Sequence, residues 1–315
     1  MKKTIPLLKT KSKTVSFQSD IVIDEDGEIF ISFFGADLLH LIDETRIEST
    51  LPREWTLPSL SPSELDVDLE SIKQEYSNCM MCPKQCGFDR VKSSHPNCGD
   101  WQLRVSNFGI SFGDEKDISR GGGSGVLFLS GCPLTCPSCI NGEKVRSDNT
   151  ATTIQDFLLM VETLYQKGAN NIQILSPSVH LPQLRLILKL LKKYSFPLPI
   201  IFKSSGYESS QELGKFKGLV DVYIPDYKFS TSCYWKKQSG ADDYHEVFQK
   251  CLDEMYNQVG AVVRDGQELI QRGVIIRHVK NPYLEENERQ VIDSFLADQS
   301  KDILISIQDN FVVLD

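Results

Sequence analysis

The sequence has no long hydrophobic run and no excess of positive charge. None of its apolar segments approaches the roughly 20 residues that a membrane-spanning helix needs. Lys and Arg number 34 against 43 Asp and Glu, a formal net charge of −9, and the isoelectric point is about 5.2. Broad binding to a phosphate backbone needs clustered Lys and Arg. We therefore expect neither a membrane nor a nucleic acid among the partners.

We also expect no secretory leader, and the cysteines support this. Met1-Lys2-Lys3 resembles the start of a signal peptide, but lysines recur where its apolar segment would follow. Of nine cysteines, seven fall within the 61 residues from Cys79 to Cys139, in short spacings that suit metal ligands better than disulfides. The sequence therefore predicts a cytoplasmic protein, in a reducing compartment where thiolates and iron–sulfur clusters persist.

Three cysteines follow directly after an apolar segment. Residues 126–129 (Val-Leu-Phe-Leu) lead into Cys132, Cys136 and Cys139, spaced C-x3-C-x2-C. Three thiolates on one short loop can ligate three irons of a [4Fe-4S] cluster and leave the fourth iron open for a substrate or cofactor. The alternatives are a zinc loop with a distant fourth ligand, or three structural cysteines.

A second group of cysteines lies upstream. Cys79, Cys82, Cys86 and Cys98 have the spacing C-x2-C-x3-C-x11-C, which is a four-ligand set for zinc or for a second cluster, with His95 as a spare ligand. The alternative is a knuckle of buried thiols that binds no metal.

The chain divides into three parts by composition. Residues 1–70 read as an N-terminal extension, with a β-hairpin at 20–33 and a linker rich in Pro and Ser at 51–63. Residues 71–118 form the Cys-rich segment, and residues 119–315 form the core.

Short apolar strands alternate with helical patterns through the core, as expected for buried parallel strands. Six β/α units predict an α/β fold with a partial (βα)6 TIM-like barrel, since a closed barrel has eight. The predicted strands are 125–130, 172–175, 199–202, 220–224, 274–277 and 303–306, and the predicted helices are about 153–167, 181–194, 209–216, 243–263 and 285–297.

Polar or charged groups follow five of these strands. In a parallel barrel the reactive groups lie where strands end. Each group alone is a weak indicator, because a single Lys or His is more often structural. Together they predict one site. The groups are the three cysteines after the first strand, Ser176 to His180 after the second, Lys203 to Tyr207 after the third, Asp226 to Lys228 after the fourth, and His278 after the fifth.

The motifs resemble those of a known enzyme family. The cysteine loop resembles the C-x3-C-x-aromatic-C hallmark of the radical S-adenosylmethionine (SAM) enzymes. Within that superfamily, about residues 78–310 are similar to pyruvate formate-lyase activating enzyme-like proteins. The resemblance covers several motifs in the expected order: Cys82 to Gly87 with Cys98-Gly99, Ser204 to Glu208, Asp221 to Lys228, Glu254 to Gly260, and Arg277 to Val279.

The resemblance implies a cofactor and a reaction. Cys132, Cys136 and Cys139 would ligate a [4Fe-4S] cluster whose open iron chelates SAM. One electron from a flavodoxin- or ferredoxin-type donor would cleave SAM, and the 5′-deoxyadenosyl radical would take a hydrogen atom from the substrate. That substrate would be a protein such as a glycyl-radical enzyme, another protein or peptide, or a small metabolite.

The resemblance also implies a SAM pocket. Ser176 and Ser178 occupy the place of a Gly-Gly-Glu loop that meets the methionyl amino group. Asp226, Lys228 and His278 match positions around the SAM carboxylate and ribose.

Three departures from the family pattern are visible. Ser138 stands where an aromatic residue usually lies near the adenine, and the Gly-Gly-Glu acid is absent. Before Ser204 and Ser205, where the family usually has an acid at a monovalent-cation site, this chain has Lys203. We expect the Lys203 ammonium to replace the cation and to pair with Asp226.

Two other functions are compatible with parts of the sequence. A radical SAM enzyme that modifies RNA is disfavoured by the net charge of −9. A non-catalytic iron–sulfur or zinc protein, acting as an electron carrier or scaffold, would explain the seven cysteines but leave Asp226, Lys228 and His278 without a purpose.

Overall fold

The N-terminal hairpin is present in the structure, a computed structural model. β2 (Phe17–Ile23) pairs with β3 (Ile29–Ser32) antiparallel, as expected, and β1 (Lys2–Ile5) adds a third strand on β2. The predicted turn between β2 and β3, the first two residues of the predicted linker and Ser138 lie outside the described residues. The structure describes residues 2–5, 17–23, 29–32, 53–112, 115–119, 122–137, 139, 141–142, 145, 150–230 and 239–308.

An eight-stranded sheet forms the centre of the molecule, in an α/β fold whose sheet is not closed. Its order is β11-β10-β8-β7-β6-β5-β4, with β9 paired to β10 off this path. The strands from β5 to β8, β10 and β11 are parallel, whereas β4 runs antiparallel to β5. The bounds are β4 Val105–Ser111, β5 Ser124–Leu129, β6 Ile172–Leu175, β7 Ile200–Ser204, β8 Val222–Pro225, β9 Val263–Arg264, β10 Ile270–Val279 and β11 Leu304–Gln308.

The six predicted strands correspond to β5, β6, β7, β8, β10 and β11. β4 and the helix α1 (Pro62–Ser77) were not expected. Residues 53–57, within the predicted linker, contact the core: the Arg53 guanidinium donates to Ala169 O over 2.8 Å, and Trp55 Nε1 donates to Tyr194 O over 2.9 Å.

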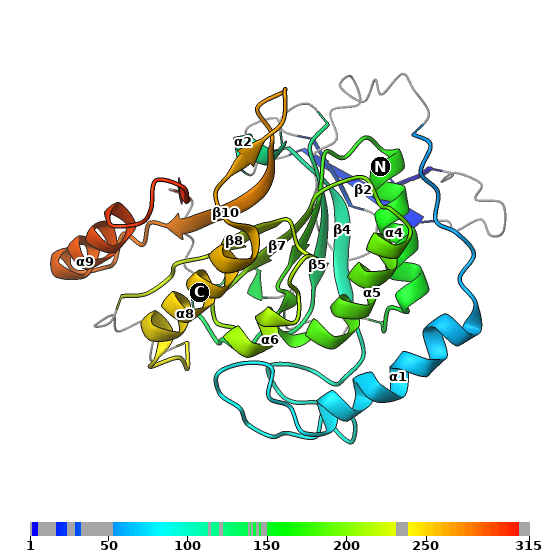
Figure 1. Cartoon of the computed structure of the whole chain (residues 1–315), viewed down its shortest axis with the longest axis horizontal. Coiled ribbons are helices and arrows are strands. Elements are labelled where there is room, and N and C mark those ends of the chain that lie inside the picture. The colour runs from blue at the N-terminus through cyan, green and yellow to red at the C-terminus, as the bar shows by residue number, and fades with distance from the viewer. Residues whose placement is uncertain are drawn as a thin grey trace.

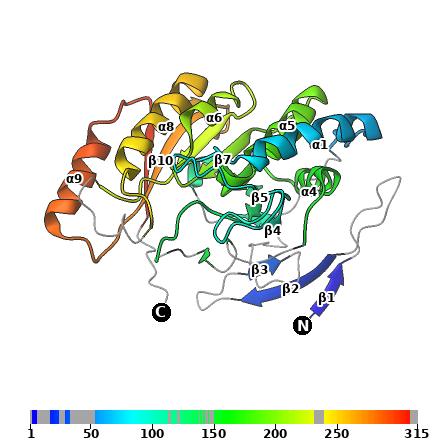
Figure 2. The same cartoon turned by 90° about the horizontal axis from the view of Figure 1, so that it is seen from below.

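The helices α1, α4, α5, α6, α8 and α9 lie along one face of the curved sheet (Figures 1 and 2), whereas the short α2 packs against the other face through Ile118. The apolar face of α4 is buried there, and Thr153 caps the helix, since Asp156 N donates to Thr153 Oγ1 over 3.0 Å. Within the described residues no helix is both long enough and apolar enough to span a bilayer. The remaining bounds are α2 Lys116–Ser119, α4 Ile154–Gln166, η1 Pro177–Val179, α5 Leu181–Lys193, α6 Ser210–Gly214, α8 Tyr244–Val259 and α9 Glu286–Ala297.

Candidate functional site

The carboxyl ends of the parallel strands meet at one edge of the sheet. Leu175 of β6 pairs with Lys203 of β7, and Lys203 pairs with Ile224 of β8. Just beyond β8, Asp226 forms an isolated parallel bridge with Arg277 of β10. Side chains two residues apart on a strand share a face. The register therefore brings Lys203, Asp226 and Arg277 to the same edge.

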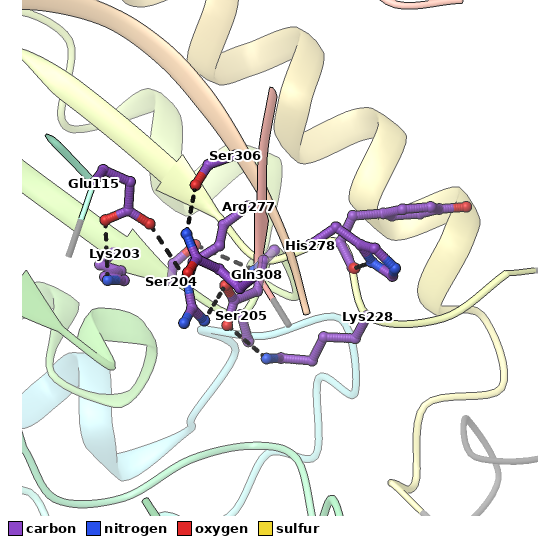
Figure 3. Close-up of polar contacts among 12 residues, drawn as sticks. Glu115, Lys203, Ser204, Ser205, Lys228, Arg277, His278, Ser306 and Gln308 are labelled. Carbon is purple, nitrogen blue, oxygen red and sulfur yellow. Dashed lines mark hydrogen bonds and ion pairs between the residues drawn. The ribbon is translucent and has the colours of Figure 1, made fainter. Parts of the chain in front are cut away.

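Five charged residues at this edge form a continuous ion-pair network (Figure 3). Asp226 Oδ2 lies 2.7 Å from Lys228 Nζ, and Asp226 Oδ1 lies 3.2 Å from an Arg277 nitrogen. Glu115 continues the network, with its two oxygens 3.4 Å from Arg277 Nε and 3.3 Å from Lys203 Nζ. Among the described residues of the network, three cations stand against two carboxylates.

The network corrects the expected partner of Lys203. The predicted direct pair with Asp226 is replaced by a pair with Glu115, whose side chain is 3% exposed. Glu115 lies just before α2, and this segment packs against the sheet through Ile118. The carboxylate therefore reaches Lys203 from a segment that precedes β5 in the sequence. Lys203 still acts on Asp226 through its charge.

The charges around Asp226 keep it ionised. Burial by itself raises the pKa of this carboxyl, but the charges of Lys228, Arg277 and Lys203 outweigh burial and lower the pKa to about 2. For Lys228, burial lowers the pKa of the ammonium, but Asp226 and the Cys136 thiol outweigh it and raise the pKa. Both groups are therefore charged at neutral pH.

The three-cysteine loop lies next to this network. Burial raises the pKa of the Cys132 thiol to about 12, the Cys136 and Cys139 thiols add to the increase, and the charge of Lys228 opposes it. Lys228 also lowers the pKa of the Cys136 thiol, against the larger effect of burial. The three thiols therefore interact with one another, and Lys228 interacts with two of them.

The upstream cysteines lie against the same loop. Cys132 N donates to Asn97 O over 3.1 Å, and Cys98 Sγ is 3.9 Å from Cys132 O. His95, the predicted spare ligand, uses Nδ1 to accept the backbone N–H groups of Asn97 and Cys98. Among the residues that the structure describes, no three His, Cys, Asp or Glu side chains are already arranged to hold a metal ion.

Glu208 was not expected at the site. It is 1% exposed, and its two oxygens accept hydrogen bonds from Ser178 Oγ over 2.5 Å and Ser204 Oγ over 3.2 Å. Burial raises its pKa to about 6, although both serine hydroxyls oppose the increase. The loop after β6 lacks an acid of its own, and the Glu208 carboxyl, from the loop after β7, contacts Ser178 in that loop. Ser176 begins this loop with a left-handed backbone, φ 58°.

Two other predicted site residues have different surroundings. The Ser205 carbonyl accepts a hydrogen bond from Tyr244 Oη over 2.7 Å, and the buried Ser205 hydroxyl has no hydrogen-bond partner among the described residues. His278 Nδ1 lies 2.8 Å from Tyr227 O, and burial lowers the pKa of the ring. Figure 3 shows His278 pointing away from Arg277. The structure therefore brings Arg277, and not the His278 ring, into the ion-pair network.

Comparisons with known proteins leave the activity open. No protein-family model matches the chain. The chain is 25% identical over 244 residues to a protein of Methanocaldococcus jannaschii named uncharacterized protein MJ0674. The similarity covers 72% of this chain and 63% of that protein, so the chain spans less than two thirds of the length of the curated relative it matches.

Proposed function

We propose that this chain is a radical SAM enzyme of the pyruvate formate-lyase activating enzyme-like group. The observation that carries the proposal is that Lys228 lies near enough to Cys132 and Cys136 for its charge to lower the pKa of both thiols, against the larger effect of burial. It joins a three-thiol loop after β5 to an ammonium that is held by Asp226 after β8. We propose that this ammonium receives the carboxylate of a ligand bound beside the thiols, because an ammonium pairs with a carboxylate as a point charge.

The topology supports the finer architecture that we propose, a partial (βα)6 barrel of the radical SAM type. Among the described strands, six parallel ones follow one another across the sheet in sequence order, and the short β9 lies off this path, paired with β10. Helices connect most of them along one face (Figure 1). Reactive groups of such folds lie at the carboxyl ends of the strands, where the cysteine loop and the ion-pair network are found.

The donor set fits the proposed cofactor. Three thiols on one loop suit an iron–sulfur cluster, and the positive charge of Lys228 favours the thiolate form of Cys132 and Cys136, against the larger effect of burial. Cys132, Cys136 and Cys139 would hold a [4Fe-4S] cluster, which, when bound, would supply the electron for reductive cleavage of SAM. The radical that abstracts hydrogen would come from SAM itself.

The remaining residues would bind SAM. We assign the methionyl carboxylate to Lys228 and Arg277, the two cations that hold Asp226. Glu208 supplies a carboxylate beside Ser178, and we assign it the methionyl ammonium. We propose a flavodoxin- or ferredoxin-type reductant, and a protein or small-molecule substrate in the cytoplasm.

Formation of 5′-deoxyadenosine tests the proposal. The protein is reconstituted anaerobically with iron and sulfide and then mixed with SAM and dithionite. We expect 5′-deoxyadenosine from the wild type, none from Cys136→Ala, and unchanged formation from Cys251→Ser, which alters a buried cysteine in α8 and keeps a donor for Glu208 O. Absence of product from a wild type that contains the full cluster would favour an electron carrier instead.

A further inference from the structure

A buried guanidinium beside the upstream cysteines has no acidic partner. Arg90 is 1% exposed, and none of the ion pairs in the described part of the chain involves it. It donates instead to backbone carbonyls: Cys98 O over 2.8 Å, Asp100 O over 2.6 Å, Gly99 O over 3.1 Å and Val179 O over 2.8 Å. An unpaired buried charge is costly. The burial of Arg90 therefore favours a negative charge close to its guanidinium.

Four free thiols are carried by the segments around Arg90, and as metal-bound thiolates they would supply negative charge. Arg90 joins the two segments that carry these thiols. Its guanidinium donates to Cys98 O over 2.8 Å and lies 4.0 Å from Met81 Sδ, and Met81 stands between Cys79 and Cys82 in the sequence. The four cysteines therefore lie in one part of the fold, although 19 positions separate Cys79 from Cys98 in the sequence.

The backbone holds three of these cysteines in one closed loop. Cys79 N donates to Phe88 O over 3.2 Å, Gly87 N donates to Cys79 O over 3.1 Å, and Gln85 N closes a turn on Cys82 O over 3.0 Å. Gln85 and Gly87 both have positive φ, 40° and 63°, which reverses the chain on either side of Cys86. The hydrogen bond from Arg90 to Cys98 O then holds the segment that carries the fourth cysteine, Cys98.

We propose that Cys79, Cys82, Cys86 and Cys98 bind one Zn²⁺ ion as a closed structural site. Four thiolates around Zn²⁺ complete its preferred tetrahedral shell and leave no position open for a substrate. The centre carries a formal charge of −2, which Arg90 and Lys84 offset. The described sulfurs are not yet arranged as metal ligands, so binding draws them together to Zn–S distances of about 2.3 Å. Cys86, which has an exposed side chain, is free to move toward the others.

The zinc site would support the loop of the three downstream cysteines. Lys84 Nζ donates to Pro133 O over 2.7 Å, and Cys132 N donates to Asn97 O, next to Cys98. At Gly131, φ is 90°, and an added Cβ would lie 2.8 Å from Cys98 O. The two cysteine segments are therefore in direct backbone contact, and loss of zinc would loosen the downstream loop.

Metal analysis of the full chain tests this site independently of SAM chemistry. Zinc and iron are measured by mass spectrometry in the purified wild type and in three variants. We expect about one zinc per chain in the wild type, in the triple variant Cys132→Ala/Cys136→Ala/Cys139→Ala, and in the matched control Cys251→Ser. We expect no zinc in Cys82→Ser/Cys98→Ser. Zinc retained in this double variant, zinc lost from the triple variant, or iron at this site instead of zinc would overturn the proposal.

A second measurement covers the case in which Cys82→Ser/Cys98→Ser fails to fold. The triple variant, which lacks the cluster ligands, is titrated with Co²⁺ after its zinc has been removed. Charge-transfer and d–d bands of tetrahedral sulfur-ligated cobalt, abolished by stoichiometric Zn²⁺, support the site. Spectra typical of octahedral oxygen ligands, or no spectral change, contradict it. The result is the same whether or not the chain cleaves SAM.

Discussion

Arg277 and His278 are neighbours on β10 with side chains on opposite faces of the sheet. Arg277 joins Asp226 and Glu115, whereas His278 bonds Tyr227 O. The family resemblance favoured His278, because a matching motif identifies a position in the sequence but does not show which way its side chain points. The alternation of strand side chains makes the arginine the residue that reaches a bound carboxylate.

We therefore expect Arg277→Gln to raise the KM for SAM. Loss of a charge-assisted hydrogen bond costs about 1.5–3 kcal/mol, which corresponds to a roughly 10- to 100-fold weaker affinity. His278→Ala should lower the melting temperature but leave KM within about 2-fold, because the ring packs among buried residues away from the network. The measurement is 5′-deoxyadenosine formation against SAM concentration. Equal effects of both substitutions on KM would contradict this division.

Glu208 predicts a pH dependence of stability. Its pKa is raised to about 6 in the folded chain from about 4.3 when unfolded. Folding therefore favours the neutral form of Glu208. The contribution of this neutral carboxyl to the free energy of unfolding is complete below about pH 4 and is lost as the pH rises through 6. The difference amounts to roughly 2 kcal/mol.

Glu208→Gln keeps a neutral side chain at every pH. We expect the free energy of unfolding of this variant, minus that of the wild type, to increase by roughly 2 kcal/mol between pH 4 and pH 7. Urea titrations at several pH values measure it. A difference that stays constant with pH would show that Glu208 is ionised like an exposed carboxyl.

At the scale of elements, Glu115 connects the segment before α2 to β7 and β10. Removing one partner of a buried pair leaves the other charge uncompensated and typically costs 3–5 kcal/mol. We expect Lys203→Met to cost about 3 kcal/mol, the lower end of that range, because Arg277 still faces Glu115. Lys203→Met/Glu115→Gln should recover part of this loss. Chemical denaturation measures both variants, and additive losses in the double variant would mean that the two residues are not coupled.

The elements that the sequence predicts best are those with continuous apolar runs. The predicted strand 125–130 is β5, Ser124–Leu129, and the predicted strand 172–175 is β6 within the same bounds. β4 was missed because Ser106, Asn107 and Gly109 interrupt its apolar pattern, although most of the strand is buried. Ser106 is tolerated there because its hydroxyl donates to Phe128 O over 3.2 Å.

The same reasoning explains which parts of the site were predictable. Groups placed directly after a strand, such as Asp226 and Lys228, were found because strand ends can be recognised from the sequence. Glu115 and Glu208 were missed because tertiary contacts bring them in: Glu115 comes from a segment before β5, and Glu208 lies four residues beyond the end of β7. No pattern along the chain pairs them with Lys203 or Ser178.

At the scale of the whole molecule, stability is expected to be highest at the centre of the sheet. β6 and β7 are fully buried and paired on both sides. β11 pairs with β10 alone among the described strands, and two of its apolar side chains, Ile305 and Ile307, are 37% and 48% exposed. Edge strands with exposed backbone groups open at lower free energy than central ones.

Hydrogen–deuterium exchange of the full chain tests this gradient. We expect amides of β6 and β7 to exchange only through global unfolding. The opening free energy measured for each of them should then equal the free energy of unfolding. Amides of β11 should exchange at least about 10-fold faster, since a local opening that costs 1.4 kcal/mol less than global unfolding has that effect. β10 serves as the internal control, because it contacts β11 but is also paired with β8. Equal protection of β11 and β6 would mean that the edge strand opens only when the whole sheet unfolds.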